Sequence, residues 1–358
     1  MKRLTYISKL SRSLTSEQIE DIGKFAQVNN ARYHITGVLL CSGGIFFQIL
    51  EGEKETIDML FAKIIKDDRH TEVLCLKNEE NITERLFPDW SMKTINLDDD
   101  IDLLMKPIKT LLNSVTESHR ILEKYTQPTI LKIMQQGLNP LDVHPRSIER
   151  IIMFSDIMSF STLMEKIPVE EVVELVNKYC TLCTEKIINQ GGEVTKFMGD
   201  CVMSYFPVEL ADNALQAAID ILTEIENLRD SAPEKSILKL LYTGIGISQG
   251  IVIEGNIGSS LKKDYTILGD AVNVAQRLES LTRELPWYCV FSSGVKDSLK
   301  LNWDLVELGN FAAKGKEKKI KLYSVKHHAT IKKEHRNQFI NYLSNYLAQV
   351  LERGKIKG

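Results

Sequence analysis

The sequence has no long hydrophobic segment. Nowhere in its 358 residues does an apolar run approach the ~20 residues that a membrane-spanning helix needs, and MKRLTYISKL at the N-terminus lacks the apolar core of a signal peptide. No charge of one sign dominates, because 45 basic side chains are set against 48 acidic ones. We therefore expect a cytoplasmic protein that binds neither membranes nor nucleic acid.

Cysteines are few and scattered, as expected where thiols stay reduced. Cys180 and Cys183 form a C-x-x-C pair, but they lie in a helical pattern with no second pair nearby, so we interpret them as core thiols. The phosphate-binding pattern G-x-x-x-x-G-K-[ST] is missing, and GIGISQG at 244–250 has the wrong spacing for a dinucleotide fingerprint. These glycines are more typical of a twisted strand.

The first part of the chain alternates between strand and helix patterns. Strands are predicted at 3–8, 36–41, 45–52, 71–77 and 89–96, and helices at 16–28 and 54–66. This order is that of a ferredoxin-like sandwich with one extra strand. We therefore predict an α+β domain over residues 1–97.

Residues 98–147 are predicted to be a helical neck and a connector. A helix is expected after Pro107, with apolar residues at 3-4 spacing: Ile108, Leu111, Val115, Leu122 and Tyr125. The spacing is typical of a coiled-coil seam, but it ends within three heptads, before Pro128. The pattern alone leaves open whether this helix pairs with a second copy or lies on its own domain.

A second α+β domain is predicted over residues 148–326. We expect a strand at 149–157, a hairpin at 193–206, a strand pair within 240–255, further late strands, and helices at 168–190, 209–230 and 270–283. The tail, residues 327–358, has the pattern of a polar helix with a basic end.

Two aspartates of this second domain flank apolar strands. Asp156 ends the strand IIMFSD, and Asp200 lies at the turn of KFMGDCVM. Each alone is usually a cap or a turn residue, but strands that pair in one sheet could bring both together. Close carboxylates repel unless a cation lies between them, so the pair favours magnesium bound with nucleotide phosphates.

Further polar residues could complete a nucleotide site. Asn273 and Arg277 are four residues apart on a predicted helix and share a face. Such a face is usually solvated, but beside a metal pair it could orient a ribose and neutralise a phosphoryl transition state. Lys314 and Lys316, on a predicted loop, are alternative ligands for the triphosphate tail.

The motifs FSDI, KFMGD, GDAVNVAQRLE and KGK, in this order, resemble the catalytic domain of class III nucleotidyl cyclases. The resemblance implies that a ribose 3′-hydroxyl attacks the α-phosphate and that pyrophosphate leaves. It also implies that Asp156, Asp200 and the backbone carbonyl of Ile157 hold two Mg²⁺ ions, for which Mn²⁺ can substitute. Asn273 would orient the ribose, and Arg277 would stabilise the five-coordinate phosphorus.

The same resemblance places the base at Lys196 and Thr266, with Phe160 also in the substrate site. Lys196 can donate to the ring nitrogen of adenine, and Thr266 can accept from its amino group, whereas guanylyl members carry Glu and Cys there. ATP is therefore the expected substrate. Ser159 replaces a glycine that is common in the family, and many adenylyl members have Asp in place of Thr266.

Each active site in this family is assembled from two domains, one giving the metal ligands and the other giving the asparagine and arginine. A chain with one cyclase domain is therefore expected to form a homodimer with two composite sites. This expectation favours a dimer contact for the helix after Pro107.

In the segment SGGIFFQILEGE, Gln48 lies inside an apolar strand. An unsatisfied buried amide costs about 1–3 kcal/mol, so Gln48 needs a partner. Together with Tyr6, Asn30 and the motifs DDRH and FPDWSM, the segment resembles a BLUF domain, a blue-light sensor that binds a flavin. The resemblance implies that Gln48 bonds both Tyr6 and the flavin ring.

Other positions carry over from the same resemblance. Asn30 would bond the flavin carbonyl edge, and Asp67, Arg69 and His70 would contact the cofactor, which is FAD with FMN as the alternative. Light would draw an electron and a proton from Tyr6, and their return would leave the glutamine in a changed hydrogen-bonded form.

Trp90 and Met92, expected on the last strand of this domain, would sense that change. The whole arrangement resembles the bacterial photoactivated adenylyl cyclases, which implies light-stimulated conversion of ATP to cyclic AMP and pyrophosphate. The alternatives are a light-regulated guanylyl cyclase and a light-regulated binding protein with an inactive cyclase scaffold.

Overall fold

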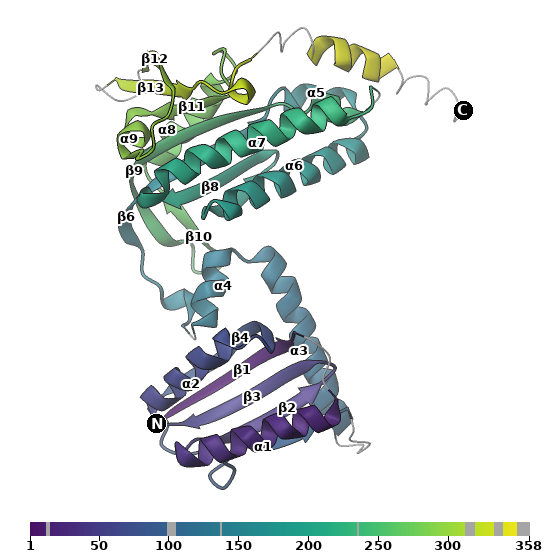
Figure 1. Cartoon of the computed structure of the whole chain (residues 1–358), viewed down its shortest axis with the longest axis vertical. Helices are drawn as coiled ribbons and strands as arrows, with labels where there is room; N and C mark the ends of the chain where they lie inside the picture. The colour runs from purple at the N-terminus through teal and green to yellow at the C-terminus, as the bar shows by residue number, and fades with distance from the viewer. Residues whose placement is uncertain are drawn as a thin grey trace. The chain divides into compact units, whose positions relative to one another are not determined.

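The chain folds into two compact units, Met1–Val143 and His144–Gly358. The computed structural model describes residues 1–11, 15–98, 105–136, 138–234, 236–311, 319–332 and 339–348. Both units combine a β-sheet with packed helices, as predicted for an α+β protein (Figure 1). Among the described residues, no helix has both the length and the apolar character needed to cross a membrane.

The first unit contains all the strands and helices predicted for it. In chain order they are β1 (Lys2–Leu10), α1 (Ser16–Arg32), β2 (Thr36–Ser42), β3 (Ile45–Gly52), α2 (Lys54–Lys66), β4 (His70–Glu80) and β5 (Lys93–Asn96). The helical segment that follows comprises α3 (Met105–Tyr125), α4 (Pro128–Gln135) and the short 3₁₀ helix η1 (Pro140–Asp142). The sequence pattern predicts only a connector where α4 forms.

The five strands of this unit form one sheet in the order β4-β1-β3-β2-β5. The first four have the ferredoxin-like arrangement, and β5 extends the sheet by pairing parallel with β2. Helices α1 and α2 cover one face of the sheet, where Ile19, Ile57 and Phe61 enter its core (Figure 1). α1 begins at a capping box, in which the Thr15 side chain accepts from the backbone N–H of Gln18.

Trp90 and Met92 precede strand β5 and are not part of it, so their predicted placement on the strand is wrong. The chain turns at this point because the backbone N–H of Trp90 bonds the carbonyl of Phe87 at 3.2 Å. The carboxylate of Glu51, which is fully buried, accepts from the backbone N–H groups of Leu86 and Phe87 and fixes the start of this turn.

Helix α3 exposes much of its apolar face within the first unit. The exposed fractions of Leu111, Leu122 and Tyr125 are 66%, 52% and 87%. A helix that packed fully on its own domain would bury these side chains, since each large apolar residue gains about 1.5–3 kcal/mol on burial. The face therefore leaves room for a partner helix.

The second unit has more strands and longer helices. Its strands are β6 (Arg146–Ile157), β7 (Glu193–Met198), β8 (Cys201–Pro207), β9 (Thr243–Gly258), β10 (Lys263–Leu268), β11 (Cys289–Ser292), β12 (Leu305–Phe311) and β13 (Ile320–Val325). Its α-helices are α5 (Phe160–Lys166), α6 (Val169–Asn189), α7 (Ala211–Ser231), α8 (Asp270–Leu281) and α9 (Ser293–Ser298). The 3₁₀ helices are η2 (Val208–Leu210), η3 (Ile237–Leu240) and η4 (His328–Thr330).

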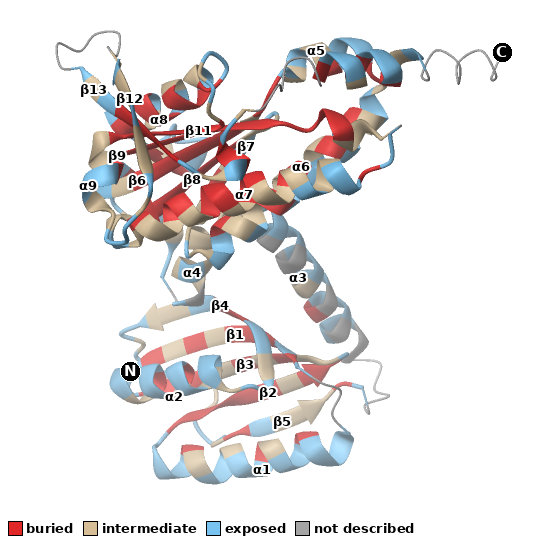
Figure 2. Ribbon diagram, turned by 45° about the horizontal axis from the view of Figure 1, so that its top comes forward, coloured by how far each residue is buried: buried red, intermediate tan, exposed pale blue. Residues whose placement is uncertain are grey.

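The sheet of this unit has the order β12-β13-β11-β9-β6-β8-β7, with β10 paired to β9. Alternate residues of β6 point to opposite faces, so Ile151 packs with α6 and α7, while Ile152 packs with α8. Figure 2 shows the buried residues gathered along these strands and on the inner faces of the helices. Cys183 is fully buried in α6, which confirms its interpretation as a core thiol.

The region predicted as a strand pair within 240–255 is a single long strand, β9. Besides β6 and β11 it pairs with β10, which turns back along its end, so that Thr266 faces Gly255. Gly244, Gly246 and Gly250 lie within β9, which confirms their interpretation as glycines of a strand. Gly246 allows close packing: a Cβ there would lie 2.1 Å from the backbone nitrogen of Glu279 in α8.

A further helix covers residues 339–348. It is less polar than predicted, since Phe339, Leu343 and Tyr346 are buried in the core that α6 and α7 share with the sheet. Part of the tail is therefore an element of the second unit.

Candidate functional site

A cavity of about 560 Å³ opens in the first unit between α1, α2 and the sheet. Its lining includes six of the residues predicted to serve a flavin: Tyr6, Asn30, Gln48, Asp67, Arg69 and His70. Large apolar side chains stand exposed along it, with exposed fractions of 67% for Phe25 and 60% for Met59. Such a cavity, mostly apolar with a few convergent polar groups, is the usual form of a cofactor site.

At the inner end of this cavity, Gln48 is bonded on both sides. Tyr6 and Gln48 face each other across β1 and β3, and the Tyr6 hydroxyl donates to the Gln48 carbonyl oxygen. The Gln48 amide nitrogen lies 3.4 Å from the Met92 sulfur. All three side chains are buried, and burial raises the pKa of the Tyr6 phenol. Tyr6, Gln48 and Met92 therefore form a connected series from the cavity to the segment before β5.

Trp90 does not share this arrangement. Its ring stacks on Phe87 with centroids 5.2 Å apart and is 40% exposed. Its backbone carbonyl accepts from Gly37, at the start of β2. Of the two predicted sensing residues, the structure brings only Met92 to the glutamine.

Asn30 provides a test of whether a flavin fits the cavity. Its side chain is 4% exposed, and its Nδ2 donor has no hydrogen-bond partner among the described residues. Leaving a buried donor unsatisfied costs about 1–3 kcal/mol. The orphaned donor lies on the cavity lining and suits the carbonyl edge of a flavin, so the residues fit this cofactor.

Asp67, Arg69 and His70 form the polar rim of the cavity. Arg69 donates to Asp67 at 2.6 Å, and this bond lowers the pKa of the Asp67 carboxyl to about 2. His70 bonds the Ser8 hydroxyl through Nδ1 at 2.9 Å, and burial lowers its pKa. A cationic guanidinium and a neutral imidazole thus stand at the cavity mouth.

The Asp67–Arg69 pair predicts a pH-dependent contribution to stability. Because folding lowers the pKa of Asp67 from 3.8 to about 2, the stabilisation is complete above pH 3.8 and is lost as the pH falls through about 2. Asp67→Asn should lower the free energy of unfolding by up to about 1 kcal/mol at neutral pH. Urea unfolding at several pH values measures this, and a difference that persists unchanged at pH 2 would contradict the assignment.

In the second unit, the predicted aspartates do meet. Asp156 lies near the end of β6, Asp200 lies at the β7–β8 turn, and β6 pairs with β8. Burial and the adjacent Asp156 carboxylate raise the pKa of Asp200 to about 7. Strand β9 fixes the backbone at Asp156, because the Thr243 hydroxyl donates to the Asp156 backbone carbonyl at 2.8 Å.

The carboxylate pair fits a divalent cation. The Asp156 Oδ1 atom is buried and lacks a hydrogen-bond partner among the described residues. Two adjacent carboxylates and nearby backbone oxygens are the hard ligands that Mg²⁺ prefers. No group of three or more His, Cys, Asp or Glu side chains suited to a metal occurs in the described ranges, so further ligands would have to come from backbone, water or substrate.

Two residues that the sequence reasoning missed lie against this pair. Arg283, just after α8, contacts Asp156 at 2.6 Å and the nearly buried Glu279 at 3.4 Å. Burial raises the pKa of Glu279 to about 7. The only signal in the sequence is the i, i+4 spacing of Glu279 and Arg283, which is common on helix surfaces.

The predicted base-binding residues occupy neighbouring hairpins. Lys196 is half-buried on β7, and Thr266 is 6% exposed on β10. The Thr266 hydroxyl has no hydrogen-bond partner among the described residues, as expected for an acceptor reserved for a ligand. Phe160 begins α5 and packs against the main core.

The remaining predicted site residues are less defined. Asn273 is exposed on α8, and Arg277 is half-buried one turn later. Lys314 and Lys316 lie outside the described residues. Ser159 has a left-handed backbone conformation with φ of 61°, which explains why glycine is favoured at this position.

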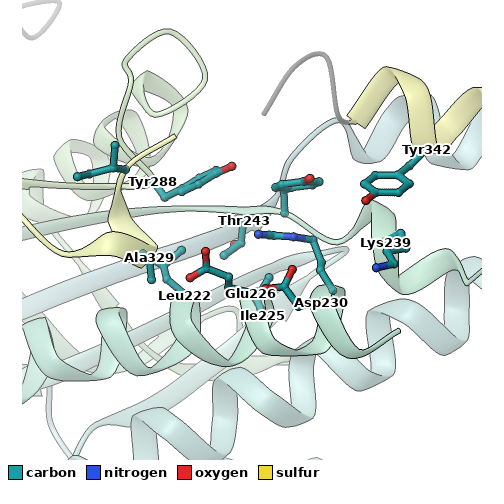
Figure 3. Close-up of a pocket in the computed structure, with 12 residues that line it drawn as sticks. Leu222, Ile225, Glu226, Asp230, Lys239, Thr243, Tyr288, Ala329 and Tyr342 are labelled. Atoms are coloured by element: carbon teal, nitrogen blue, oxygen red, sulfur yellow. The ribbon is translucent and has the colours of Figure 1, made fainter. Parts of the chain in front are cut away.

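A second cavity, of about 210 Å³, lies on the α7 side of the sheet in the same unit. Figure 3 shows Glu226 and Asp230 on α7 and Tyr342 from the helix at 339–348 among its lining residues. It also includes Thr243, so this cavity borders the residue that supports Asp156.

Comparison with known families agrees with this geometry. Residues 1–93 match the family described as sensors of blue light using FAD, the BLUF domain. Residues 143–327 match the adenylate and guanylate cyclase catalytic domain. The chain belongs to the class III nucleotidyl cyclases that carry an N-terminal BLUF domain.

Individual relatives share both parts. A solved structure of a bacterial light-regulated adenylyl cyclase is 51% identical, with a TM-score of 0.85 over 97% of this chain and 99% of that one. Photoactivated adenylate cyclase subunit beta of Euglena longa is 33% identical over 83% of this chain. Subunit alpha of Euglena gracilis is 32% identical over a similar span. The chain covers only about a third of the length of these Euglena proteins.

Proposed function

We propose that this protein is a blue-light-activated adenylyl cyclase that converts ATP to 3′,5′-cyclic AMP and pyrophosphate. The observation that carries the proposal is the half-buried carboxylate pair, Asp156 and Asp200, in a chain that also holds the Tyr6–Gln48–Met92 series beside a cofactor-sized cavity. The similarity to light-regulated adenylyl cyclases supports both halves.

In the proposed catalytic site, Asp156, Asp200 and the Ile157 carbonyl would hold two Mg²⁺ ions, or Mn²⁺ in their place. Metal ions bound there would supply a lower pKa for the attacking 3′-hydroxyl and neutralising charge for the leaving pyrophosphate. Asn273 orients the ribose and Arg277 stabilises the charge on the α-phosphate. Either Lys314 or Lys316 binds the terminal phosphates.

In the proposed sensor, FAD bound in the cavity would supply the blue-light absorption and the electron acceptor. Tyr6 holds the proton that would move with the electron, because its hydroxyl already donates to Gln48. The Gln48 side-chain amide has both a hydrogen-bond donor and an acceptor, so it can exchange these two roles. Met92 contacts the amide nitrogen and is therefore placed to respond to the exchange. Asn30, Asp67, Arg69 and His70 bind and orient the cofactor.

We also propose a homodimer with two composite active sites. Asn273 is exposed and therefore available to a partner's carboxylate pair. The exposed apolar face of α3, with Leu111 and Tyr125, supports a helix–helix contact. The fold and the cyclase relatives agree with such an assembly.

The base pocket gives a prediction of reversed substrate choice. Lys196→Glu with Thr266→Cys should lower cyclic AMP formation and raise cyclic GMP formation by about tenfold or more, because guanine then finds an acceptor for its ring N–H. Lys196→Glu alone should mainly harm ATP turnover. Initial rates with each nucleotide measure the preference, and an unchanged ATP/GTP ratio in the double variant would remove both residues from base recognition.

One experiment separates the proposal from its alternatives. Product is measured from ATP and from GTP, in darkness and under blue light. Light-stimulated cyclic AMP is expected. Cyclic GMP as the main product would indicate a guanylyl cyclase, and no product from a folded, flavin-loaded protein would indicate a binding scaffold.

A further inference from the structure

Arg283 lies between two carboxylates at the metal site. Its Nη2 atom is 2.6 Å from Asp156 Oδ2 and 3.4 Å from Glu279 Oε1. The Arg283 side chain is 43% exposed, whereas those of Asp156 and Glu279 are 18% and 4% exposed. A partly exposed guanidinium therefore contacts two carboxylates that are mostly shielded from solvent.

Arg283 donates to Asp156 Oδ2, a carboxylate oxygen that a bound metal ion would also use. Asp156 Oδ1 is buried and has no hydrogen-bond partner in the described part of the chain, while Oδ2 is held by the guanidinium. A guanidinium and a divalent cation at the same carboxylate repel each other. Filling the metal site thus requires Arg283 to weaken or break this bond.

Glu279 is the alternative partner for the Arg283 guanidinium when it leaves Asp156. Its Oε1 atom has no hydrogen-bond partner among the described residues, and its Oε2 atom is 3.5 Å from Arg283 Nη1. Because Glu279 is on the last turn of α8, four residues before Arg283, a rotation of the arginine side chain is enough to form a closer pair there. Lys332 donates to the backbone carbonyl of Thr282, so a second cation lies near Arg283 and repels it.

We propose that Arg283 is a positioning residue that competes with the metal for Asp156 and moves to Glu279 when the metal binds. The inference rests on the proposed function, because it takes Asp156 as a metal ligand. In the metal-free enzyme, Arg283 offsets the repulsion between Asp156 and Asp200. The contact between Arg283 and Asp156 weakens metal binding, because the arginine must leave Asp156 and pair with Glu279 before the metal can bind.

The test measures Mn²⁺ binding to the full chain without nucleotide, with free Mn²⁺ followed by electron paramagnetic resonance. Arg283→Gln should bind Mn²⁺ about threefold or more tightly than the unchanged protein, because the competing cation is gone. Arg283→Lys keeps the charge and should stay close to the unchanged affinity. Glu279→Gln should bind more weakly, because the arginine loses its alternative partner.

Opposite shifts in two adjacent variants would not arise from a general loss of structure, and thermal unfolding of each variant checks its fold. Equal or weaker Mn²⁺ binding by Arg283→Gln would overturn the inference. Asp156→Asn separates this outcome from failure of the proposed function. If Asp156→Asn and the unchanged protein bind Mn²⁺ equally, the metal site itself is wrong.

Discussion

Replacing Asp156 by asparagine is expected to lower cyclic AMP formation by on the order of 100-fold or more, because the change removes a metal-binding charge where the reaction needs it. The fold should persist, since asparagine has the same shape and the backbone carbonyl of Asp156 keeps its bond to Thr243. Steady-state rates at saturating Mg²⁺ and far-ultraviolet circular dichroism measure the two effects.

The composite-site proposal extends this prediction to mixtures. Asn273→Ala with Arg277→Ala should be as inactive as Asp156→Asn, because it removes the opposite half of the site. Random exchange of the two inactive proteins makes half of the dimers mixed, each with one intact site, so activity should recover to about a quarter of the unchanged level. Absence of recovery after proven subunit exchange would contradict shared sites.

Replacing Gln48 by leucine is expected to abolish the light response without loss of flavin. Leucine suits the apolar strand β3, and Asn30 with the Asp67–Arg69 rim still lines the cavity, so the purified protein should remain yellow. The small red shift of the lit state should vanish, because the amide between Tyr6 and Met92 is gone. Absorption spectra in darkness and after illumination measure this directly.

Cyclase assays complete the test of Gln48. Dark activity should survive, because Asp156 and Asp200 are unchanged, whereas stimulation by light should be lost. Tyr6→Phe tests the same path independently. It should also abolish the response to light, since it removes the hydroxyl that donates to Gln48. A Gln48→Leu protein that still shifts and still responds to light would remove Gln48 from the signalling path.

Much of the architecture could be predicted because local patterns and long-range packing agree. The helix predicted at 54–66 is α2, with the same ends. The strands of the first unit were identifiable because their apolar residues are bounded by turn residues such as Gly43 and Gly44. The meeting of Asp156 and Asp200 was accessible for the same reason, since both lie at ends of strands that pair.

The errors arise where tertiary contacts override local pattern. Trp90 and Met92 alternate with polar residues, as in a strand, but the buried Glu51 carboxylate bonds the backbone just before them and holds a turn. The segment 240–255 was predicted as a strand pair, but residues 243–254 pair continuously with β6 and therefore form one strand. Neither cause is encoded within the segment itself.

Contacts between side chains that are distant in the sequence could not be predicted either. Arg283 and Asp156 are far apart in the chain, and only the packing of α8 against β6 and β9 brings them within 2.6 Å. The cavity beside Gln48 likewise depends on how α1 and α2 are set over the sheet.

Helix α8 has a consequence for communication within a dimer. Its first turns carry Asn273, proposed to serve the partner's active site, while its last turn carries Glu279, which contacts Arg283 beside the chain's own Asp156. Gly246 lets this helix lie directly against the sheet, and one continuous helix therefore joins the two positions. Metal occupancy of one site should then alter ribose positioning in the other, and turnover should show cooperativity in Mg²⁺ that a monomeric cyclase would lack.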